Sequence, residues 1–536
     1  MKTTSTVEAA TKGAGLVLLV LASGQFLMTL DSSVMNVSIA TVAKDVGTTV
    51  TGIQTAITLY TLVMASLMIT GGKIGAIIGR RRAFGIGLVI YGAGSFTTAI
   101  APNLTVLIIG WSFLEGIGAA LIMPAIVALV AGNFPPTKRS AAYGMIAAAG
   151  AMAVAAGPLI GGAFTTFWSW RWVFLGEDVI VVLILLTMRK IQDVPPGERP
   201  HIDFVGALLS IVGLSMAVLG VLKSAEWGWL QPKTDAPTLF GASLVVWLIL
   251  GGLFVLWLFM EWEERMERQG KEPLLRMELL GNRQLSGGLM MFFFQFMVQA
   301  GTFFVIPLFL SVVLGLSALA TGVRLLPLSF SLLIFAIAIP KFWPQANPRR
   351  VVRIGLLALF GGALMLAAGI DPEADATITT IPMLLMGCGI GALASQLGAV
   401  TVSAVPDERS AEVGGVQNTA TNLGASLGTA LVGSILIATL TASFITGIQN
   451  NPTVPDQVKA QASTELASGI PFISDADLQA ALTNAGVPPD LTAQIVQENS
   501  EARLVALRAS MSIVALFTVV ALFLSTRIPT KAVGTA

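Results

Sequence analysis

Residues 136–144 have the sequence PTKRSAAYG, and residues 406–414 have the sequence PDERSAEVG. Their Pro, Arg, Ser, Ala and Gly residues match at a constant offset of 270 residues. Two more matches precede them in the same order: GIGAAL (116–121) with GIGALA (389–394), and RRAFGIGLVIYGAG (81–94) with RRVVRIGLLALFGG (349–362). Three matches at near-constant spacing predict an internal repeat.

The composition indicates a membrane protein. Of the 536 residues, 54% are hydrophobic and only 11% are charged, and the mean hydropathy is +0.81. Soluble domains carry about 25% charged residues. A helix needs about 20 apolar residues to cross the hydrocarbon, and fourteen runs of that kind are present: 14–40, 51–71, 83–101, 104–131, 141–165, 172–188, 204–223, 238–260, 285–313, 320–340, 353–370, 377–404, 412–443 and 504–526.

The repeat divides these spans. Span four matches span twelve, and span five matches span thirteen. We therefore expect an all-α membrane protein with an N-terminal six-helix bundle (1–200), an inserted helix pair with a cytoplasmic loop (201–284), and a C-terminal six-helix bundle (285–536). Transporters built from parallel repeats place the substrate site between the halves near the midplane.

Lys and Arg set the expected orientation. With the N-terminus in the cytoplasm, 23 of the 31 Lys and Arg residues fall on the cytoplasmic side, as the positive-inside rule requires. The even number of spans returns the C-terminus to the cytoplasm. The polar segment at about 444–503 then lies outside as a surface connector, and Ser474-Asp475 should begin a short helix through Ala485.

Several function classes are disfavoured. The net charge of +1 provides no basic field for nucleic acid. A single cysteine (Cys388) and a single histidine (His201) supply no disulfide, metal cluster or His-based catalytic centre, and no phosphate-binding G-x-x-x-x-G-K-[ST] motif occurs. We expect no enzymatic activity, no cofactor and no metal site.

Two acidic residues fall deep within predicted spans. Asp31 on span one and Glu115 on span four both lie about ten residues, roughly 15 Å, from the outer ends of their helices. Such groups are costly in a membrane and often relay protons or bind cations. Alternatively, each is a hydrogen-bonded packing group. Glu177 and Asp178 begin span six and are expected at the wet interface or paired with Arg171.

Span five contains the sequence GAMAVAAGPLIGG (150–162). Gly150, Ala153, Gly157 and Gly161 form one smooth face, which permits close helix approach, and Pro158 permits a bend. This helix is either a packed pivot against the other half or a static packing element.

The chain resembles the fourteen-helix drug:proton antiporter (multidrug efflux) branch of the major facilitator superfamily. LDSSVMNVSIA (30–40) is similar to the branch's first-helix motif, GGKIGAIIGRRR (71–82) to the superfamily loop, and GPLIGG (157–162) to the helix-five antiporter motif. The resemblance implies two bundles that rock in alternating access, export of hydrophobic or cationic compounds, exchange for protons, a monomer, and location in the bacterial cytoplasmic (inner) membrane.

Three positions depart from the family pattern. The family usually has Asp at the position of Ala76, Arg at that of Ser112 and Gln at that of Glu115. The chain has therefore lost a buried positive charge and gained a negative one near Asp31. This weakens the case for the usual coupling and favours a relocated proton site or a cation site.

The resulting site predictions fall into four groups. Asp31 and Glu115 carry the proton or a cation. Asn36, Met291, Phe293, Phe296 and Met297 line the substrate cavity. Gly72, Gly79, Arg80, Arg81 and Arg82 form the inner gate, and Gly150, Gly157, Pro158, Gly161 and Gly162 form the helix-five motif. Two alternatives remain: a lipid or lipid-like transporter of the same fold, and a transport-inactive receptor or sensor.

Overall fold

The computed structural model describes residues 2–193, 202–233, 236–371, 374–405, 410–466 and 469–531. His201 and the repeat residues 406–409 lie outside the described residues. Within them, the chain is helical except for loops and one antiparallel hairpin, β1 (Thr238–Leu239) with β2 (Ala242–Ser243). This confirms an all-helical membrane fold.

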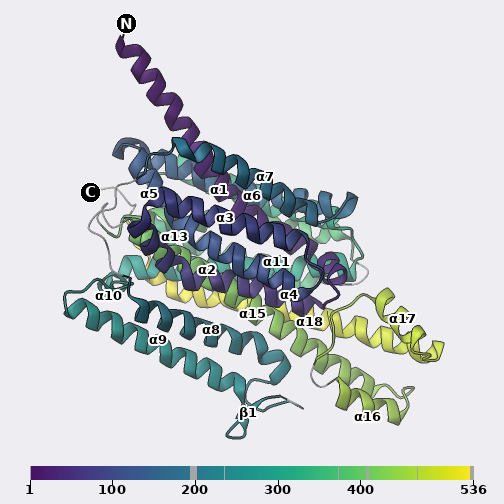
Figure 1. Cartoon of the computed structure of the whole chain (residues 1–536). Helices are drawn as coiled ribbons and strands as arrows, with labels where there is room; N and C mark the ends of the chain where they lie inside the picture. Colours follow the sequence, from purple (N-terminus) through teal and green to yellow (C-terminus); the bar gives the residue numbers. More distant parts are fainter. Residues whose placement is uncertain are drawn as a thin grey trace.

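Long helices run roughly along one direction (Figure 1). In the N-terminal part they are α1 (Lys2–Asp45), α2 (Val50–Ile78), α3 (Arg80–Ala99), the continuous run α4 (Leu104–Leu107), η1 (Ile108–Glu115) and α5 (Gly116–Asn133), then α6 (Pro136–Phe167) and α7 (Arg171–Thr187), followed by η2 (Met188–Lys190). Next come α8 (Phe204–Trp227), α9 (Leu244–Arg268) and the short α10 (Met277–Gly281). The C-terminal part contains α11 (Arg283–Leu308) with η3 (Phe309–Val313), α12 (Ala318–Phe342), α13 (Pro348–Gly369), η4 (Ala376–Thr379) with α14 (Thr380–Val402), α15 (Ser410–Asn450), α16 (Asp456–Glu465), α17 (Asp475–Asn484), α18 (Pro489–Leu524) and η6 (Ser525–Arg527).

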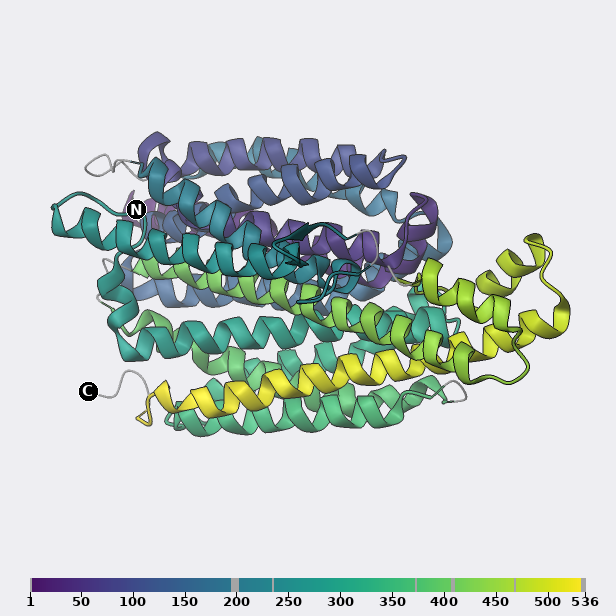
Figure 2. The same ribbon diagram turned by 90° about the horizontal axis from the view of Figure 1, so that it is seen from below.

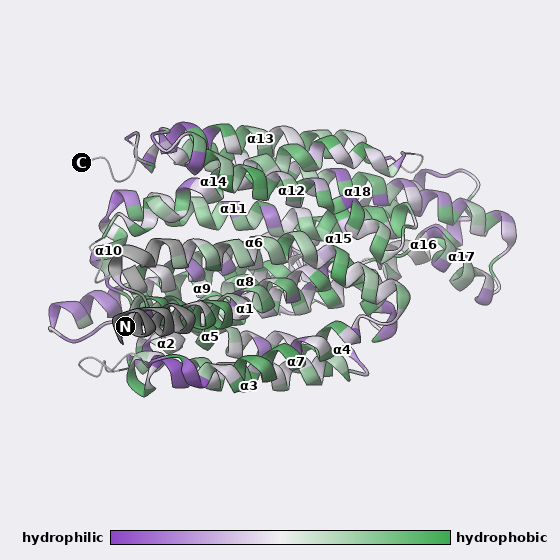
Figure 3. Ribbon diagram, turned by 90° about the horizontal axis from the view of Figure 1, so that it is seen from above, coloured by the Kyte–Doolittle hydropathy of each residue, from purple (hydrophilic) through white to green (hydrophobic). Residues whose placement is uncertain are grey.

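Twelve of the described helices are long and apolar enough to cross a membrane. Hydrophobic residues cover their middle parts, and hydrophilic residues gather at the helix ends and on α16 and α17 (Figure 3). The other two predicted spans coincide with α3, which begins with three arginines, and with α7, which has only 17 residues. The structure therefore supports twelve of the fourteen predicted spans by length and composition.

The helices associate in two sets with an added pair. Within the first set, α1 packs on α6, and α3 packs on α5 and α7; within the second, α11 packs on α15, and α14 packs on α12 and α13. The pair α8–α9 lies beside both sets because α8 contacts α2 and α15 (Figures 1 and 2).

Glycines in both repeat segments allow backbones to approach closely. A Cβ added to Gly118 on α5 would lie 2.7 Å from the carbonyl oxygen of Gly87 on α3. In the other set, a Cβ added to Gly389 on α14 would lie 2.5 Å from the carbonyl oxygen of Gly355 on α13. The repeated motifs thus make the same kind of helix contact in each set.

The two sets meet along two seams near the end of the molecule that carries α16 and α17, termed here the α16–α17 end. In the α2–α15 seam, Gln54 Nε2 donates to the Thr429 carbonyl (3.2 Å), and Ser426 Oγ donates to the Thr58 carbonyl (2.9 Å). In the α6–α12 seam, the Leu319 amide donates to Thr166 Oγ1 (3.0 Å).

The polar segment at 444–503 is more helical than predicted. α15 continues to Asn450 and α18 begins at Pro489, so both helices project beyond the bundle, with α16 and α17 between them (Figure 2). The prediction of a helix after Ser474 is confirmed, since Ser474 Oγ accepts from the Asp477 amide at the start of α17. The buried Arg503 of α18 anchors this helix by pairing with Asp475 (2.5 Å).

Candidate functional site

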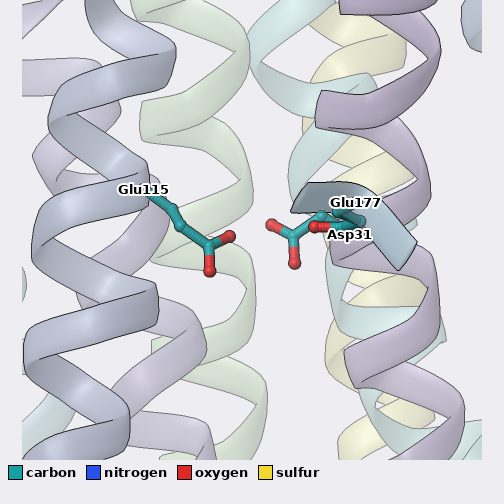
Figure 4. Close-up of side chains that lie close together, drawn as sticks. All are labelled: Asp31, Glu115 and Glu177. Atoms are coloured by element: carbon teal, nitrogen blue, oxygen red, sulfur yellow. The ribbon is translucent and has the colours of Figure 1, made fainter. Parts of the chain in front are cut away.

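Three carboxyl groups meet inside the N-terminal set of helices. Asp31 lies on α1, Glu115 on η1 and Glu177 on α7, and at most 1% of each residue is exposed. One oxygen from each lies within 4.8 Å of the others. Glu115 approaches from one side and the other two from the opposite side, with the carboxyl groups directed toward one another (Figure 4). We call these residues the acidic cluster.

Each carboxyl in the cluster is held by neutral donors. Trp111 Nε1 donates to Asp31 Oδ1 (2.7 Å), and Thr98 Oγ1 donates to Glu115 Oε1 (3.0 Å). Tyr91 OH donates to Glu177 Oε2 (2.9 Å), and Ser95 Oγ donates to the same atom (3.2 Å). Within the described residues, no hydrogen-bond partner is found for Asp31 Oδ2, Glu115 Oε2 or Glu177 Oε1.

Local backbone geometry brings Glu115 to this place. The segment Ile108–Glu115 is a π-helix within the longer helix, a feature often found at functional sites because it re-aims side chains. Gly94 on α3 leaves room for the glutamate, since a Cβ there would lie 2.7 Å from Glu115 Cγ. The structure thus brings Asp31 and Glu115 together, as their similar depth predicts.

Glu177 is a member that the sequence interpretation missed. The expectation that it lies at the wet interface or pairs with Arg171 is wrong: Glu177 is buried, and Arg171 pairs with Asp45 (2.9 Å). A signal was present, since Val173, Phe174, Glu177, Val181 and Ile184 form the buried stripe of α7. A carboxyl on that helical stripe had to face the bundle interior.

The cluster has no cationic partner in the part of the chain that the structure describes, since none of the ion pairs found there includes its residues. Ser112, where the family usually has Arg, donates to the Ala56 carbonyl (2.8 Å). Three neighbouring carboxyls in a dry interior cannot all be ionised without compensation. Protons can supply it, and the three oxygens could also hold a hard cation.

A cavity of about 380 Å³ lies between the two sets of helices. Its lining is uncharged and consists of aromatic, apolar, amide and hydroxyl groups. The polar amides come from both sets: Gln25, Asn36, Gln295, Gln299, Gln417, Asn418 and Asn422. Tyr60 and Trp111 form one side, with stacked rings 5.0 Å apart at 9°. Trp111 therefore separates the cavity from Asp31, to which it donates.

The cavity lining matches the predicted residues only in part. Asn36 and Phe296 line it, whereas Met291, Phe293 and Met297 are not among its lining residues. The backbones of Phe293 and Met297 instead meet Gly424 and Gly428 of α15. The lining face of α11 follows helical spacing: Phe292, Gln295, Phe296, Gln299, Ala300 and Phe303.

The helix-five motif residues lie on α6 and face two partners. Cβ atoms added to Gly157 and Gly161 would collide with Ser33 and Val34 of α1, and one added to Gly150 would lie 3.4 Å from Gln25. Gly162 and Pro158 face the other half instead. A Cβ on Gly162 would lie 2.6 Å from the Ala318 carbonyl oxygen of α12, and one on Gly322 of α12 would overlap the Pro158 carbonyl oxygen.

The predicted inner-gate residues, in the segment 71–82 that joins α2 to α3, lie at the opposite end from α16 and α17. Gly79 adopts φ +99°, which favours glycine, and Arg80 Nη1 donates to the Gly72 carbonyl (2.5 Å). Arg81 donates through its amide to Asp193 Oδ1 (3.0 Å) and through its side chain to the Ile191 carbonyl (3.0 Å). Arg82 is exposed.

Asp193 is a second residue that the sequence interpretation missed. It accepts from the first turn of α3 although it follows η2, 112 residues further along the chain. In this position it supplies an acidic cap for α3 beside Gly79, close to the last turn of α2, which contains Ala76. No local sequence pattern could have indicated this contact.

Comparison with known proteins agrees with this architecture. The family model described as Major Facilitator Superfamily matches residues 21–429. The puromycin resistance protein pur8 of Streptomyces alboniger is 29% identical over 424 residues, covering 78% of this chain and 81% of the relative. The methylenomycin A resistance protein of Bacillus subtilis is 26% identical over 438 residues, covering 81% and 91%.

Solved structures show the same fold at low sequence identity. A bacterial homolog of the human lysosomal transporter Spinster, in an inward-facing and unoccupied conformation, matches with a TM-score of 0.59 and 14% identity over 96% of this chain and 98% of that one. A D-xylose-proton symporter matches with a TM-score of 0.53 and 15% identity over 78% and 90%. With its helical bundle, central cavity and family match, the chain belongs to the Major Facilitator Superfamily.

Proposed function

We propose that the protein exports hydrophobic or cationic small molecules in exchange for protons by alternating access. The observation that carries the proposal is the buried acidic cluster directly behind the wall of a cavity between the two sets of helices. Relatives with names such as multidrug resistance protein Stp of Mycobacterium tuberculosis, 25% identical over 448 residues, support a drug-like cargo.

The cavity suits such cargo. Its aromatic side chains, Tyr60, Trp111, Phe292, Phe296 and Phe303, offer apolar area and π-faces that attract cations. Its amides and hydroxyls can satisfy scattered polar groups without demanding one geometry. Because this lining is uncharged, cargo in the cavity would interact with the acidic cluster through wall residues such as Trp111 rather than by direct contact.

The acidic cluster suits proton exchange. Asp31, Glu115 and Glu177 share a dry site where one carboxyl's charge opposes ionisation of the next. The cluster can therefore hold protons in one state of the cycle and lose them in another. Intramembrane carboxyls of this kind mark proton pathways in transporters.

The seams suit a rocking motion. Pro158 and Gly162 of α6 meet α12 near the α16–α17 end, where smooth glycine surfaces can separate and rejoin. Arg80 and Arg81 tie the α2–α3 loop to neighbouring carbonyls at the opposite end. Opening one end while closing the other would give alternating access of the cavity.

The proposal includes the finer topology. α3 and α7 complete fourteen spans because both expose apolar side chains, such as Ile86 and Val89 on α3 and Leu183 and Leu186 on α7. The chain then divides into bundles at 1–200 and 285–536 with the helix pair at 201–284 between them. The monomer lies in a bacterial cytoplasmic membrane with both termini in the cytoplasm and α16–α17 outside.

Vesicles containing purified protein test the function with ethidium, a hydrophobic cationic dye. We expect an imposed pH gradient to drive ethidium movement that disappears when the gradient is collapsed and in Asp31→Asn. Asp45→Asn is the matched control, because Asp45 lies on the same helix but is exposed and pairs with Arg171. Movement that ignores the gradient, or that survives in Asp31→Asn, contradicts the proposal. Movement of labelled lipid alone would favour a lipid transporter, and no movement of either probe would favour a receptor.

A further inference from the structure

The indole of Trp111 takes part in two sites at once. One side of the residue lines the central cavity and stacks on Tyr60, with ring centroids 5.0 Å apart. Its Nε1 donates to Asp31 Oδ1 at 2.7 Å, a short bond between two groups that are almost fully buried. Asp31 itself is not among the cavity-lining residues. Cargo in the cavity can therefore affect Asp31 through Trp111 without touching it.

The bond depends on the charge of Asp31. An N–H donor binds a carboxylate about twice as strongly as it binds a neutral acceptor, and the difference grows in a dry interior. Protonation of Asp31 therefore weakens the hold on the indole. A freed indole can turn on its backbone in η1 and change the cavity wall, including its stack on Tyr60.

Titratable groups on neighbouring elements surround Asp31. Tyr60 on α2, Tyr91 on α3, Glu115 on η1, and Glu177 and Asp178 on α7 share its electrostatic environment. The described parts of α5, and of α6 beyond residue 141, contain no charged residue. The cationic residues of α11 and α12 are Arg283, Arg324 and Lys341, and each lies within two turns of a helix end. Two cavity-lining residues lie against Asp31: Trp111, whose Nε1 donates to it, and Tyr60, on which Trp111 stacks.

We propose that Trp111 couples cargo to protons: the indole that forms the cavity wall also holds the ionised carboxylate of Asp31, so that cargo binding and protonation oppose each other through one side chain. The inference rests on the proposed exchange of cargo for protons and adds the residue that transmits it. Because binding linkage is reciprocal, bound cargo must favour loss of the proton by the same factor by which the proton weakens cargo binding.

The test is the pH dependence of ethidium affinity in purified full-length protein. For the wild type, affinity should fall on acidification, by at most about tenfold per pH unit if one proton competes. Trp111→Phe keeps an aromatic ring for the stack on Tyr60 and removes the N–H donor. It should bind ethidium with an affinity that no longer changes with pH. Phe292→Leu, which changes a cavity-lining residue of α11 in the other set of helices, should weaken binding but keep the pH dependence.

The outcomes separate this inference from the proposed function. Absence of gradient-driven ethidium transport in the wild type would overturn the proposed function. Coupled transport in the wild type together with unchanged pH dependence in Trp111→Phe would overturn only the role of Trp111.

A second measurement covers the case of a variant that does not fold. Infrared difference spectra of the wild type, with and without ethidium, should show a carboxyl band change that is missing in Asp31→Asn. A spectrum without that change would show that cargo does not reach Asp31 and would overturn the inference.

Discussion

At the scale of residues, the proposed exchange depends on three buried carboxyls that form no ion pair among the described residues. Asp31 and Glu115 could be predicted because acidic residues deep in apolar spans are conspicuous. Glu177 was misjudged because it begins a span, although its position on the buried stripe of α7 indicates an inward side chain. The similar depth of Asp31 and Glu115 indicated that they share a site, but the approach of Glu177 to both could not be predicted, because it depends on the packing of three helices.

Replacement of Glu177 tests the third carboxyl. Glu177→Gln retains an oxygen that can accept from Tyr91 and Ser95, so the protein should fold. Gradient-driven ethidium transport should fall at least about tenfold, equivalent to about 1.4 kcal/mol in activation free energy. Asp45→Asn, which changes an exposed carboxyl of α1 that pairs with Arg171, should stay within about twofold. Equal activity of Glu177→Gln and the wild type would remove Glu177 from the proton site.

Asp193 should stabilise the start of α3. Its replacement by Ala removes the acceptor for the Arg81 amide and should cost about 1 kcal/mol, as loss of a helix cap does. Asp193→Asn keeps a side-chain oxygen at the same place and should retain most of that stability. Thermal unfolding of the purified variants measures the difference. If the Ala and Asn variants melt at the same temperature as the wild type, Asp193 has no capping role.

At the scale of elements, small residues determine which helices meet. The sequence predicted a smooth face on α6, and the structure divides the motif between two partners, with Gly157 and Gly161 against α1 and Gly162 against α12. This division could not be predicted, because small-residue spacing does not identify the opposing helix. The lining face of α11 shows the same limit: its Phe and Met residues were recognised, but the face directed at the cavity follows from tertiary packing.

Gly162 tests the α6–α12 seam. Gly162→Ala places a methyl group against the Ala318 carbonyl, an overpacking that should cost about 1–3 kcal/mol in the closed seam. Spin labels at the exposed Phe167 and Val323 should report a longer distance across the seam, and ethidium transport should fall. Gly361→Ala is the control, since nothing lies within 4 Å of a Cβ there. An unchanged label distance in Gly162→Ala would show that this contact does not hold the seam.

At the scale of the whole molecule, the internal repeat predicted two helix bundles with an inserted helix pair. Two sets of helices with an added pair and a cavity between the sets agree with the duplicated segments and with the family match. The extension of α15 and α18 beyond the apolar stretches was not predicted, because hydropathy marks where a helix crosses lipid and not where it ends.

Single cysteines test the orientation. In a Cys388→Ser background, Ala480→Cys on α17 should react with a membrane-impermeant maleimide in intact cells, because the residue is exposed at the α16–α17 end. Gln269→Cys, exposed after α9, should react only after the membrane is permeabilised. The reverse pattern would invert the proposed topology.

The most direct test of the exchange is proton release from purified protein in weakly buffered detergent solution. If cargo and proton oppose each other at the acidic cluster, saturating ethidium should acidify the solution near neutral pH, and Asp31→Asn should release markedly less. No proton release from a wild-type protein that demonstrably binds ethidium, or equal release from Asp31→Asn, would contradict the central claim.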